Sequence, residues 1–334
     1  MKLFLIRHGE TVDNVAGLYA GVRDSPLTNF GVDQTRHLGN YLANSDIKIT
    51  HIFSSPLTRA FKTAEALQNA QKTRVVDVPQ LQIVKVQALI EQDFGYYEGR
   101  SFYARSKLGK SGKDVHREAH RATDGFVDVE SKESLDRRAD TFLDEYLVPL
   151  LAASDDEHED AVAIISHGIL LAHLWRRLLA RLPRRSLQVS AEVTAAKGSS
   201  LILEHLGGWS NTGYLELHLT MRDAKAETLA SSSQADGFPV ADVAQATART
   251  SRPTVSPAET KDNALTSPVS HKMKTGDTRG AFRLDGWSTL IAAVNSHQHL
   301  VGLKRQRGGI GSMKHDAGQT KLDSFFVKKK RLSE

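Results

Sequence analysis

The sequence predicts an α/β protein in which a largely parallel sheet is covered by helices on both faces. Over residues 1 to about 220, short apolar runs of strand length alternate with longer runs that have helical spacing. Alternation of this kind is typical of strand–helix units, which build parallel sheets. The composition then changes abruptly at about Arg222. We therefore expect one α/β domain over residues 1–221, followed by regions of a different kind.

The individual elements follow from local patterns. Leu38, Tyr41 and Leu42 lie at helical spacing, and Pro56 occupies a first helical turn, where proline is tolerated. Strands are expected at Lys2–Ile6, Ile49–Ser54, Ala161–Ser166, Ser200–Leu206 and Tyr214–Met221, and helices at Gly31–Ala43, Pro56–Ala70, Ser134–Leu151 and Gly168–Leu182.

Residues 222–280 have the composition of a linker. They are rich in Ala, Ser, Thr, Pro and Asp, and Phe238 is their only aromatic residue. Such a segment buries too little apolar surface to offset the entropy that it would lose on ordering. The sequence therefore predicts a disordered linker here.

A return to order is expected in the next segment, residues 281–311. Trp287, Leu290, Ile291 and Val294 would fall on one face of a helix. A short helix is therefore predicted within this segment. It either packs on the main domain or binds a partner, and the pattern favours neither alternative.

The composition excludes several classes of site. The chain has no cysteine, which excludes disulfides, thiolate nucleophiles and cysteine–zinc sites. The N-terminal apolar stretch is too short for a signal peptide, and no run has the length of a membrane span, so we expect a soluble intracellular protein. The formal net charge is +5, but residues 302–334 alone hold nine Lys and Arg against three acids. No direct nucleic-acid binding is therefore expected from the main domain.

Four separate segments carry groups suited to phosphate chemistry. Arg7 and His8 follow the first strand, Arg59 opens the helix behind the second, and His167 follows a fully apolar strand; Glu91 lies in a less regular segment. Ligands of α/β sheets bind at the carboxyl ends of the strands, beside helix N-termini. Because three of the four segments have that position, we expect these side chains to converge.

These residue types match one chemistry. Guanidinium groups bind phosphate oxygens bidentately, and a neutral imidazole can attack phosphorus directly. A protonated carboxyl can supply the proton that the leaving alkoxide needs and can then activate water. Taken alone, each residue has an ordinary interpretation, as a turn, a structural histidine or a solvated charge. Their combination in this order favours a phosphoryl-transfer site.

With these motifs, the sequence resembles the phosphoglycerate-mutase-like branch of the histidine phosphatase superfamily over residues 1 to about 220. The resemblance implies a three-layer α/β/α sandwich and a reaction that needs no metal or other cofactor. It also implies that Asn14 orients the phosphate or the surroundings of His8. Further matching positions are Asp24–Thr28, Gly31, Gln34, and Glu133-Ser134 ahead of Arg137 or Arg138.

The resemblance implies a role for each residue of the site. His8 would be the nucleophile that becomes phosphorylated, and Glu91 would donate the proton. The residues that would hold the phosphoryl group are Arg7, Arg59 and His167.

The branch of the family is indicated by the segment after Glu91. Residues 93–99, Asp-Phe-Gly-Tyr-Tyr-Glu-Gly, resemble the phosphatases of the family, and the stretch with which its mutases hold a second phosphate is not found. Ala20 stands where relatives often have a polar residue. We therefore expect hydrolysis of a phosphomonoester, of a small molecule or a protein, with phosphoglycerate mutase activity as the alternative.

Residues 312–334 contain a second motif. Gln319, Leu322, Phe325 and Phe326 resemble the PCNA-interacting peptide (PIP-box), in which the aliphatic and aromatic side chains plug an apolar pocket of the sliding clamp. The alternative is a chance match. The basic cluster 328–331 would be an import signal, a contact to an acidic clamp surface or a solvated charge run.

Three hypotheses follow for the whole chain. The first is a phosphatase tethered to PCNA, located in the nucleus or shared between nucleus and cytoplasm. The second is a catalytically idle scaffold that only binds a phosphorylated ligand. The third is a metabolic mutase whose tail motif is accidental.

Overall fold

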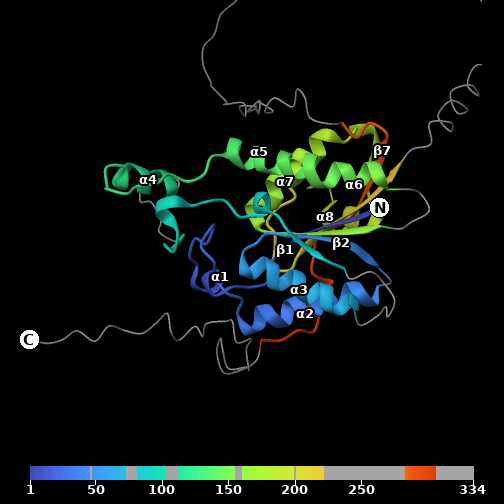
Figure 1. Cartoon of the computed structure of the whole chain (residues 1–334), viewed down its shortest axis with the longest axis horizontal. Helices are drawn as coiled ribbons and strands as arrows, with labels where there is room; N and C mark the ends of the chain where they lie inside the picture. Colours follow the sequence, from blue (N-terminus) through green and yellow to red (C-terminus); the bar gives the residue numbers. More distant parts are fainter. Residues whose placement is uncertain are drawn as a thin grey trace, which may run out of the picture. The chain divides into compact units, whose positions relative to one another are not determined.

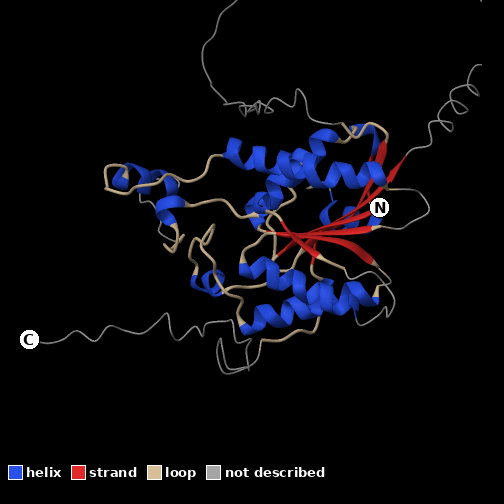
Figure 2. Ribbon diagram, in the orientation of Figure 1, coloured by secondary structure: helices blue, strands red, loops and turns tan. Residues whose placement is uncertain are grey.

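Seven strands in the described part of the chain form one mixed sheet in the order β3-β2-β4-β1-β6-β7-β5 (Figures 1 and 2). The computed structural model describes residues 1–45, 47–72, 81–102, 112–154, 160–198, 201–221 and 283–305. The strands are β1 (Lys2–Arg7), β2 (Ile49–Ser54), β3 (Ile83–Lys85), β4 (Ala161–Ser166), β5 (Leu187–Val189), β6 (Tyr214–Met221) and β7 (Trp287–Ser296). Strand β6 runs antiparallel to both neighbours, and the other pairs are parallel.

Helices cover both faces of the sheet, so the predicted three-layer α/β/α sandwich is confirmed (Figure 1). Helices α2 and α3 lie on one face, and α5, α6 and α7 on the other. The helices are α1 (Val12–Ala16), α2 (Asn29–Asn44), α3 (Thr58–Lys72), α4 (Gly112–His120), α5 (Lys132–Phe142), α6 (Val148–Ala153), α7 (Gly168–Arg181) and α8 (Ala191–Lys197); a π-helical turn, Leu143–Leu147, joins α5 to α6. None of the helices in this part of the chain is long and apolar enough to cross a membrane.

Strand β1 shows why the sheet has two cores. Leu3 and Leu5 pack on the α7 side, whereas Phe4 and Ile6 pack on the α2 side, and all four are fully buried. Successive side chains of a strand point to opposite faces, so a strand buried on both sides is continuously apolar.

The register of the central strands brings their carboxyl ends to one edge. Arg7 of β1 lies opposite Ser166 of β4, and Ser54 of β2 lies opposite Ile165. The residues that follow these strands are therefore neighbours in space although they are far apart in the sequence.

The segment predicted as a helix at 281–311 is instead strand β7, followed by a 3₁₀ turn at Gln298–Leu300. Trp287, Thr289 and Ile291 are buried in alternation, and β7 pairs with β6 on one side and β5 on the other. The helical spacing of the apolar residues was misleading because Thr289 is one of the buried positions. Residues 283–305 belong to the same compact unit as residues 1–221, so of the two alternatives left open by the sequence this segment packs on the main domain.

A second prediction was wrong at residues 200–206. The chain makes a tight turn there, with an isolated bridge between Ile202 and His205, and residues 199–200 are outside the described part. The predicted linker at 222–280 and the tail at 312–334 also lie outside the described residues. The other predicted strands and helices are present within two residues of most expected ends.

Candidate active site

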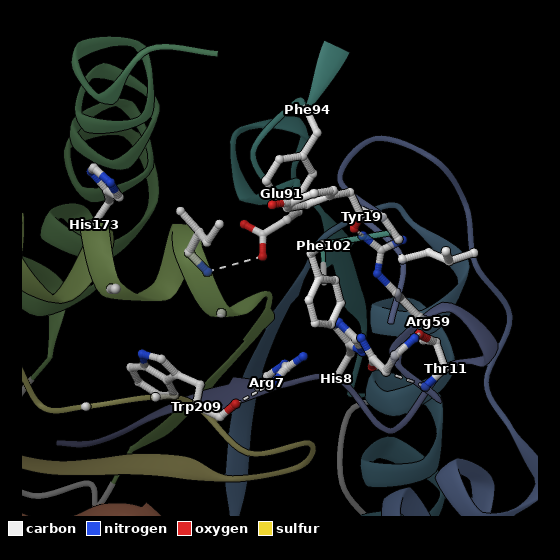
Figure 3. Close-up of a pocket in the computed structure, with 18 of the residues that line it drawn as sticks. Arg7, His8, Thr11, Tyr19, Arg59, Glu91, Phe94, Phe102, His173 and Trp209 are labelled. Carbon is white, nitrogen blue, oxygen red and sulfur yellow. Dashed lines mark hydrogen bonds between the residues drawn. The ribbon is translucent and has the colours of Figure 1, made fainter. Parts of the chain in front are cut away.

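The carboxyl ends of β1, β2 and β4 open into a cavity of about 520 Å³ (Figure 3). Arg7, His8 and Arg59 line its floor, and Glu91 faces them from the chain segment that precedes α4 (Figure 3). The walls are formed by α1 and the loop after it, the segment between β3 and α4, helix α7 and the turn before β6. The side chains on these walls include Asn14, Tyr19, Phe94, Phe102, Ile169, His173, Arg176 and Trp209.

His8 is held as a neutral imidazole of one tautomer. Its Nδ1 lies 2.7 Å from the Gly9 carbonyl oxygen, which can only accept, so Nδ1 carries the proton. Burial and the nearby Arg59 and Arg7 charges lower the pKa of His8 well below its usual value of 6.5. The lone pair of Nε2 is therefore available for nucleophilic attack at neutral pH.

His167 is held in the opposite tautomer. The Arg59 Nε donates to its Nδ1 at 3.2 Å, so Nε2 carries the proton and donates to the Ser55 hydroxyl at 2.9 Å. Burial lowers the pKa of His167 well below 6.5, and Arg59 adds to that effect. The His167 and His8 ring centroids are 5.1 Å apart. The floor and the His167 ring that contacts Arg59 thus combine two neutral imidazoles with two guanidinium groups.

Arg59 is fixed by backbone carbonyl groups. It is 1% exposed, and its guanidinium donates to the carbonyl oxygens of Arg23, Ala20 and Gly21 at 2.8, 3.1 and 2.7 Å. Burial lowers the pKa of Arg59 and Glu91 opposes that shift, so a cation is kept in a site with little water. Its position therefore depends on the loop at residues 20–23.

The loop at residues 20–23 is in turn held by Glu98. The Glu98 carboxylate accepts the backbone N–H groups of Gly21, Val22 and Arg23 at 3.0 to 3.3 Å, and that of Phe94 at 3.0 Å. A side chain at Gly21 would lie 1.9 Å from the Gln92 carbonyl oxygen, so only glycine fits there. Glu98 lies in the motif that indicated a phosphatase, but its role was not apparent from sequence.

Arg7 uses one of its nitrogens to bond to the protein and leaves another without a partner among the described residues. Its Nη1 donates to the Trp209 carbonyl oxygen, whereas its Nε is buried and bonds to no described residue. Burial lowers the pKa of Arg7, and Glu91 opposes that shift. Figure 3 places the Arg7 guanidinium between Trp209 and His8. Arg7 therefore keeps a donor for an anion bound at the floor.

Glu91 is positioned by the first turn of α7. Its carboxylate accepts the backbone N–H groups of Ile169 and Leu170, both at 3.1 Å, and of Gln92 at 2.9 Å. Arg138 holds the backbone on this side by donating to the carbonyl oxygen of Glu91 at 3.2 Å. Of the two arginines left open by the sequence, Arg138 therefore supports the site.

Asn14 and the turn before β6 hold the backbone of His8. The Asn14 Oδ1 accepts from the Thr11 N–H at 3.2 Å and from the Asn211 Nδ2 at 3.0 Å. Asn211 also donates to the His8 carbonyl oxygen at 3.2 Å, as does the Thr212 N–H. Thr212 has a φ of 56°, a strained value for a β-branched residue. Asn211 and Thr212 were not found from sequence because they carry no motif.

The structure brings together all six residues predicted for the pocket. Arg7, His8, Asn14, Arg59 and Glu91 line the cavity, and His167 contacts Arg59. Their catalytic and binding roles stay predictions. The residues predicted to bind PCNA, namely Gln319, Leu322, Phe325 and Phe326, lie outside the described residues. Within the described ranges, no group of three or more His, Asp and Glu side chains could hold a metal ion.

Two guanidinium groups and two neutral imidazoles thus lie at the carboxyl ends of neighbouring parallel strands, an arrangement that suits a phosphate dianion. The chain belongs to the histidine phosphatase superfamily (branch 1), which it matches over residues 3–250. The resemblance found from the motifs is therefore confirmed for the family.

Relatives include both phosphatases and mutases. The chain is 34% identical over 178 residues to a protein of Schizosaccharomyces pombe named as a probable phosphatase, covering 53% of this chain and 56% of that protein. It is 34% identical over 119 residues to a 2,3-bisphosphoglycerate-dependent phosphoglycerate mutase of Rhizobium rhizogenes, covering 35% and 54%. The chain thus spans little more than half the length of these relatives.

Among solved structures, a mycobacterial glucosyl-3-phosphoglycerate phosphatase has a TM-score of 0.47 and 23% identity to this chain. The match covers 66% of this chain and 91% of that protein.

Proposed function

We propose that the protein is a metal-independent phosphomonoester hydrolase that acts through a phosphohistidine at His8. The observation that supports this most directly is the His8 tautomer, since the Gly9 carbonyl takes the Nδ1 proton and leaves Nε2 unprotonated among positive charges. A neutral nucleophile beside Arg7 and Arg59 attacks a phosphoryl group whose oxygens those guanidinium groups hold.

The reaction proceeds in two displacements. In the first, the Nε2 lone pair of His8 bonds to phosphorus, the ester P–O bond breaks, and the Glu91 carboxyl protonates the leaving oxygen. In the second, the Glu91 carboxylate takes a proton from water, the water oxygen bonds to phosphorus, and the P–N bond breaks. His8 keeps its Nδ1 proton throughout, and the Gly9 carbonyl stabilises the positive charge on the phosphorylated ring.

The test is phosphate release in EDTA from a panel of phosphomonoesters. We expect turnover by the wild type and a loss of at least about 1,000-fold in kcat for His8→Ala, since the nucleophile is removed. His205→Ala is the matched control, because His205 is exposed in the turn at residues 201–206. Equal turnover by the wild type and His8→Ala would contradict the proposal. Binding without turnover would instead indicate a scaffold that reads phosphorylated ligands.

Mutase activity is the second candidate function, because a phosphoglycerate mutase is among the relatives. The two activities are separated by incubating the protein with 2-phosphoglycerate and a catalytic amount of 2,3-bisphosphoglycerate. We expect free phosphate to form faster than 3-phosphoglycerate. The reverse order would favour the mutase.

We also propose that the tail docks on PCNA through Gln319, Leu322, Phe325 and Phe326, which gives the protein a nuclear location. Its support is the spacing of these residues and the basic cluster 328–331 behind them. Two adjacent aromatic side chains that enter a pocket can supply most of the binding free energy of a short peptide.

Clamp binding is tested with the full chain and purified PCNA. We expect at least a tenfold weaker Kd for Phe325→Ala combined with Phe326→Ala, because both anchors are lost. Ile310→Ala combined with Met313→Ala truncates two apolar side chains outside the motif and is the control. Equal Kd values for the two double variants would contradict the docking proposal.

A further inference from the structure

One face of α7 runs along the cavity away from the phosphoryl site. Ile169, Ala172, His173 and Arg176 line the cavity, and their spacing is that of one helical face. The helix begins at Gly168, next to the N–H groups that hold Glu91. At a rise of 1.5 Å per residue, the Arg176 Cα lies about 12 Å further along the axis.

Arg176 differs from the other arginines of this helix. Arg177 pairs with Asp140 at 2.6 Å, and Arg181 pairs with Asp144 and Asp140 at 2.5 and 2.8 Å, which ties α7 to α5. Arg176 is half-buried, lines the cavity, and forms no hydrogen bond or ion pair with the residues that the structure describes. It is therefore a cation placed in the cavity without a bonded partner there.

The charge at this end of the cavity comes from Arg176 and not from His173. The His173 Nδ1 bonds to an Asp136 oxygen at 2.6 Å, yet burial lowers the pKa of His173, which leaves it neutral at pH 7. Asp136 also attracts Arg176, but the two are not within ion-pair distance. A half-buried guanidinium is partly stripped of water, so an anion bound beside it would be strongly favoured.

The side of the cavity opposite α7 carries an aromatic cluster of Tyr19, Phe94 and Phe102 (Figure 3). The Tyr19 ring lies 4.8 Å from that of Phe94 and 5.7 Å from that of Phe102, between ring centroids. Phe102 is 41% exposed, and Trp209 lies across the cavity from this cluster (Figure 3). A planar or apolar body fits between such rings, which favour stacked contacts.

We propose that Arg176 binds a second anionic group of the substrate, at the end remote from the scissile phosphate. The substrate class is then a phosphomonoester whose alcohol has an apolar or planar body that carries a carboxylate or phosphate at its far end. This inference rests on the proposed function, because it names the substrate of the same site. It also separates this substrate class from phosphoglycerates, in which the carboxylate lies only one or two carbon atoms from the carbon that bears the ester.

The test uses phenyl phosphate and its 2-, 3- and 4-carboxy derivatives, which move a carboxylate away from the ester in steps. The measured quantity is kcat/KM for each carboxylated ester divided by kcat/KM for phenyl phosphate. In Arg176→Gln, we expect this ratio to fall about tenfold or more for the 3- and 4-isomers, the size of one lost charge-assisted hydrogen bond. Arg176→Lys should restore part of it. The exposed Arg185, changed to Gln, is the control with the same loss of charge.

Two outcomes would overturn the inference. One is an equal ratio in wild type and Arg176→Gln, and the other is a loss confined to the 2-isomer. Failure of the proposed function is a separate result, in which the wild type hydrolyses none of the four esters. The Kd values of the same four esters, measured on His8→Ala and on His8→Ala with Arg176→Gln, test the anion site without turnover.

Discussion

At the floor of the cavity the reactive side chains are held by hydrogen bonds from the protein, whereas at the far end Arg176 bonds to no described residue. Arg59 has three backbone carbonyl partners, and His8 and His167 are each locked in one tautomer. Arg176 lines the same cavity without such support.

The difference indicates how the two ends are used. Groups that stabilise a transition state act best when they are already oriented, because no reorganisation is then needed during the reaction. A cation that is left unbonded keeps its affinity for a ligand. We infer that the floor is built for one reaction and that the far end selects which substrate reaches it.

The largest effect is expected from a variant that weakens the support of the cavity floor and leaves every reacting group in place. Glu98→Gln removes the charge that holds the loop at residues 20–23, whose carbonyl groups fix Arg59. We expect kcat/KM for phenyl phosphate to fall about 10- to 100-fold, since small displacements of a positioned group are costly.

The inhibition constant of inorganic phosphate distinguishes a positioning role from a general loss of stability. In Glu98→Gln it should rise together with the loss of kcat/KM, and Glu98→Asp should recover part of both. The control is Glu145→Gln, because Glu145 is exposed on the π-helical turn. An unchanged inhibition constant in a folded Glu98→Gln protein would contradict the positioning role.

A second prediction concerns pH, because His8 and His167 are buried in the neutral form. In the unfolded chain each titrates near 6.5, whereas folding lowers both pKa values well below that. As the pH falls below about 6.5, the unfolded chain therefore takes up protons that the folded protein does not, and the free energy of unfolding decreases. The expected slope is up to about 1.4 kcal/mol per pH unit for each histidine.

Urea unfolding at pH 7.5 and 5.5 measures this slope. His8→Gln should show a smaller decrease than the wild type between these two pH values, because one titrating group is gone. The exposed His205, changed to Gln, should keep the wild-type decrease. Equal slopes for His8→Gln and the wild type would show that burial does not hold His8 neutral.

The smallest effect is expected outside the cavity. Arg305, in the segment after β7, pairs with both carboxylate oxygens of Glu10, at 3.0 and 2.5 Å, two residues after His8. Its side chain is 44% exposed, so Arg305→Gln should lower the free energy of unfolding by less than about 1 kcal/mol. Urea unfolding checks the stability. A loss of kcat/KM as large as that of Glu98→Gln would show that the floor also depends on this contact.

The central strands of the sheet were predictable because each is marked by a pattern of neighbouring residues in the sequence. Strands β1, β2 and β4 are largely apolar runs that are followed directly by His8, Ser55 and His167, and the topology of parallel sheets then brings these residues together. Strand β7 was not predictable because its partner β6 is distant in sequence. Its buried Thr289 also hides the alternation that would reveal a strand.

The support of the site was predictable only in part. Glu98 and Ser55 lie inside recognised motifs, but Glu98 bonds to a loop backbone and Ser55 to His167, which follows another strand. Asn211 holds the His8 carbonyl group across 203 residues of sequence, and no local pattern marks it. The sequence does not show which arginine of α7 lacks a bonded partner. The structure does, because Arg177 and Arg181 form ion pairs with acidic residues whereas Arg176 bonds to no described residue.

The central claim is covalent catalysis by His8, and its most direct test is to trap the phosphoenzyme. The protein is mixed with an excess of phenyl phosphate, quenched in alkali to preserve phosphohistidine, and mapped by mass spectrometry. We expect one phosphoryl group, on His8, in the wild type and none in His8→Ala. Phosphate found on His167, or turnover by the wild type with no phosphohistidine under rapid quenching, would contradict the account.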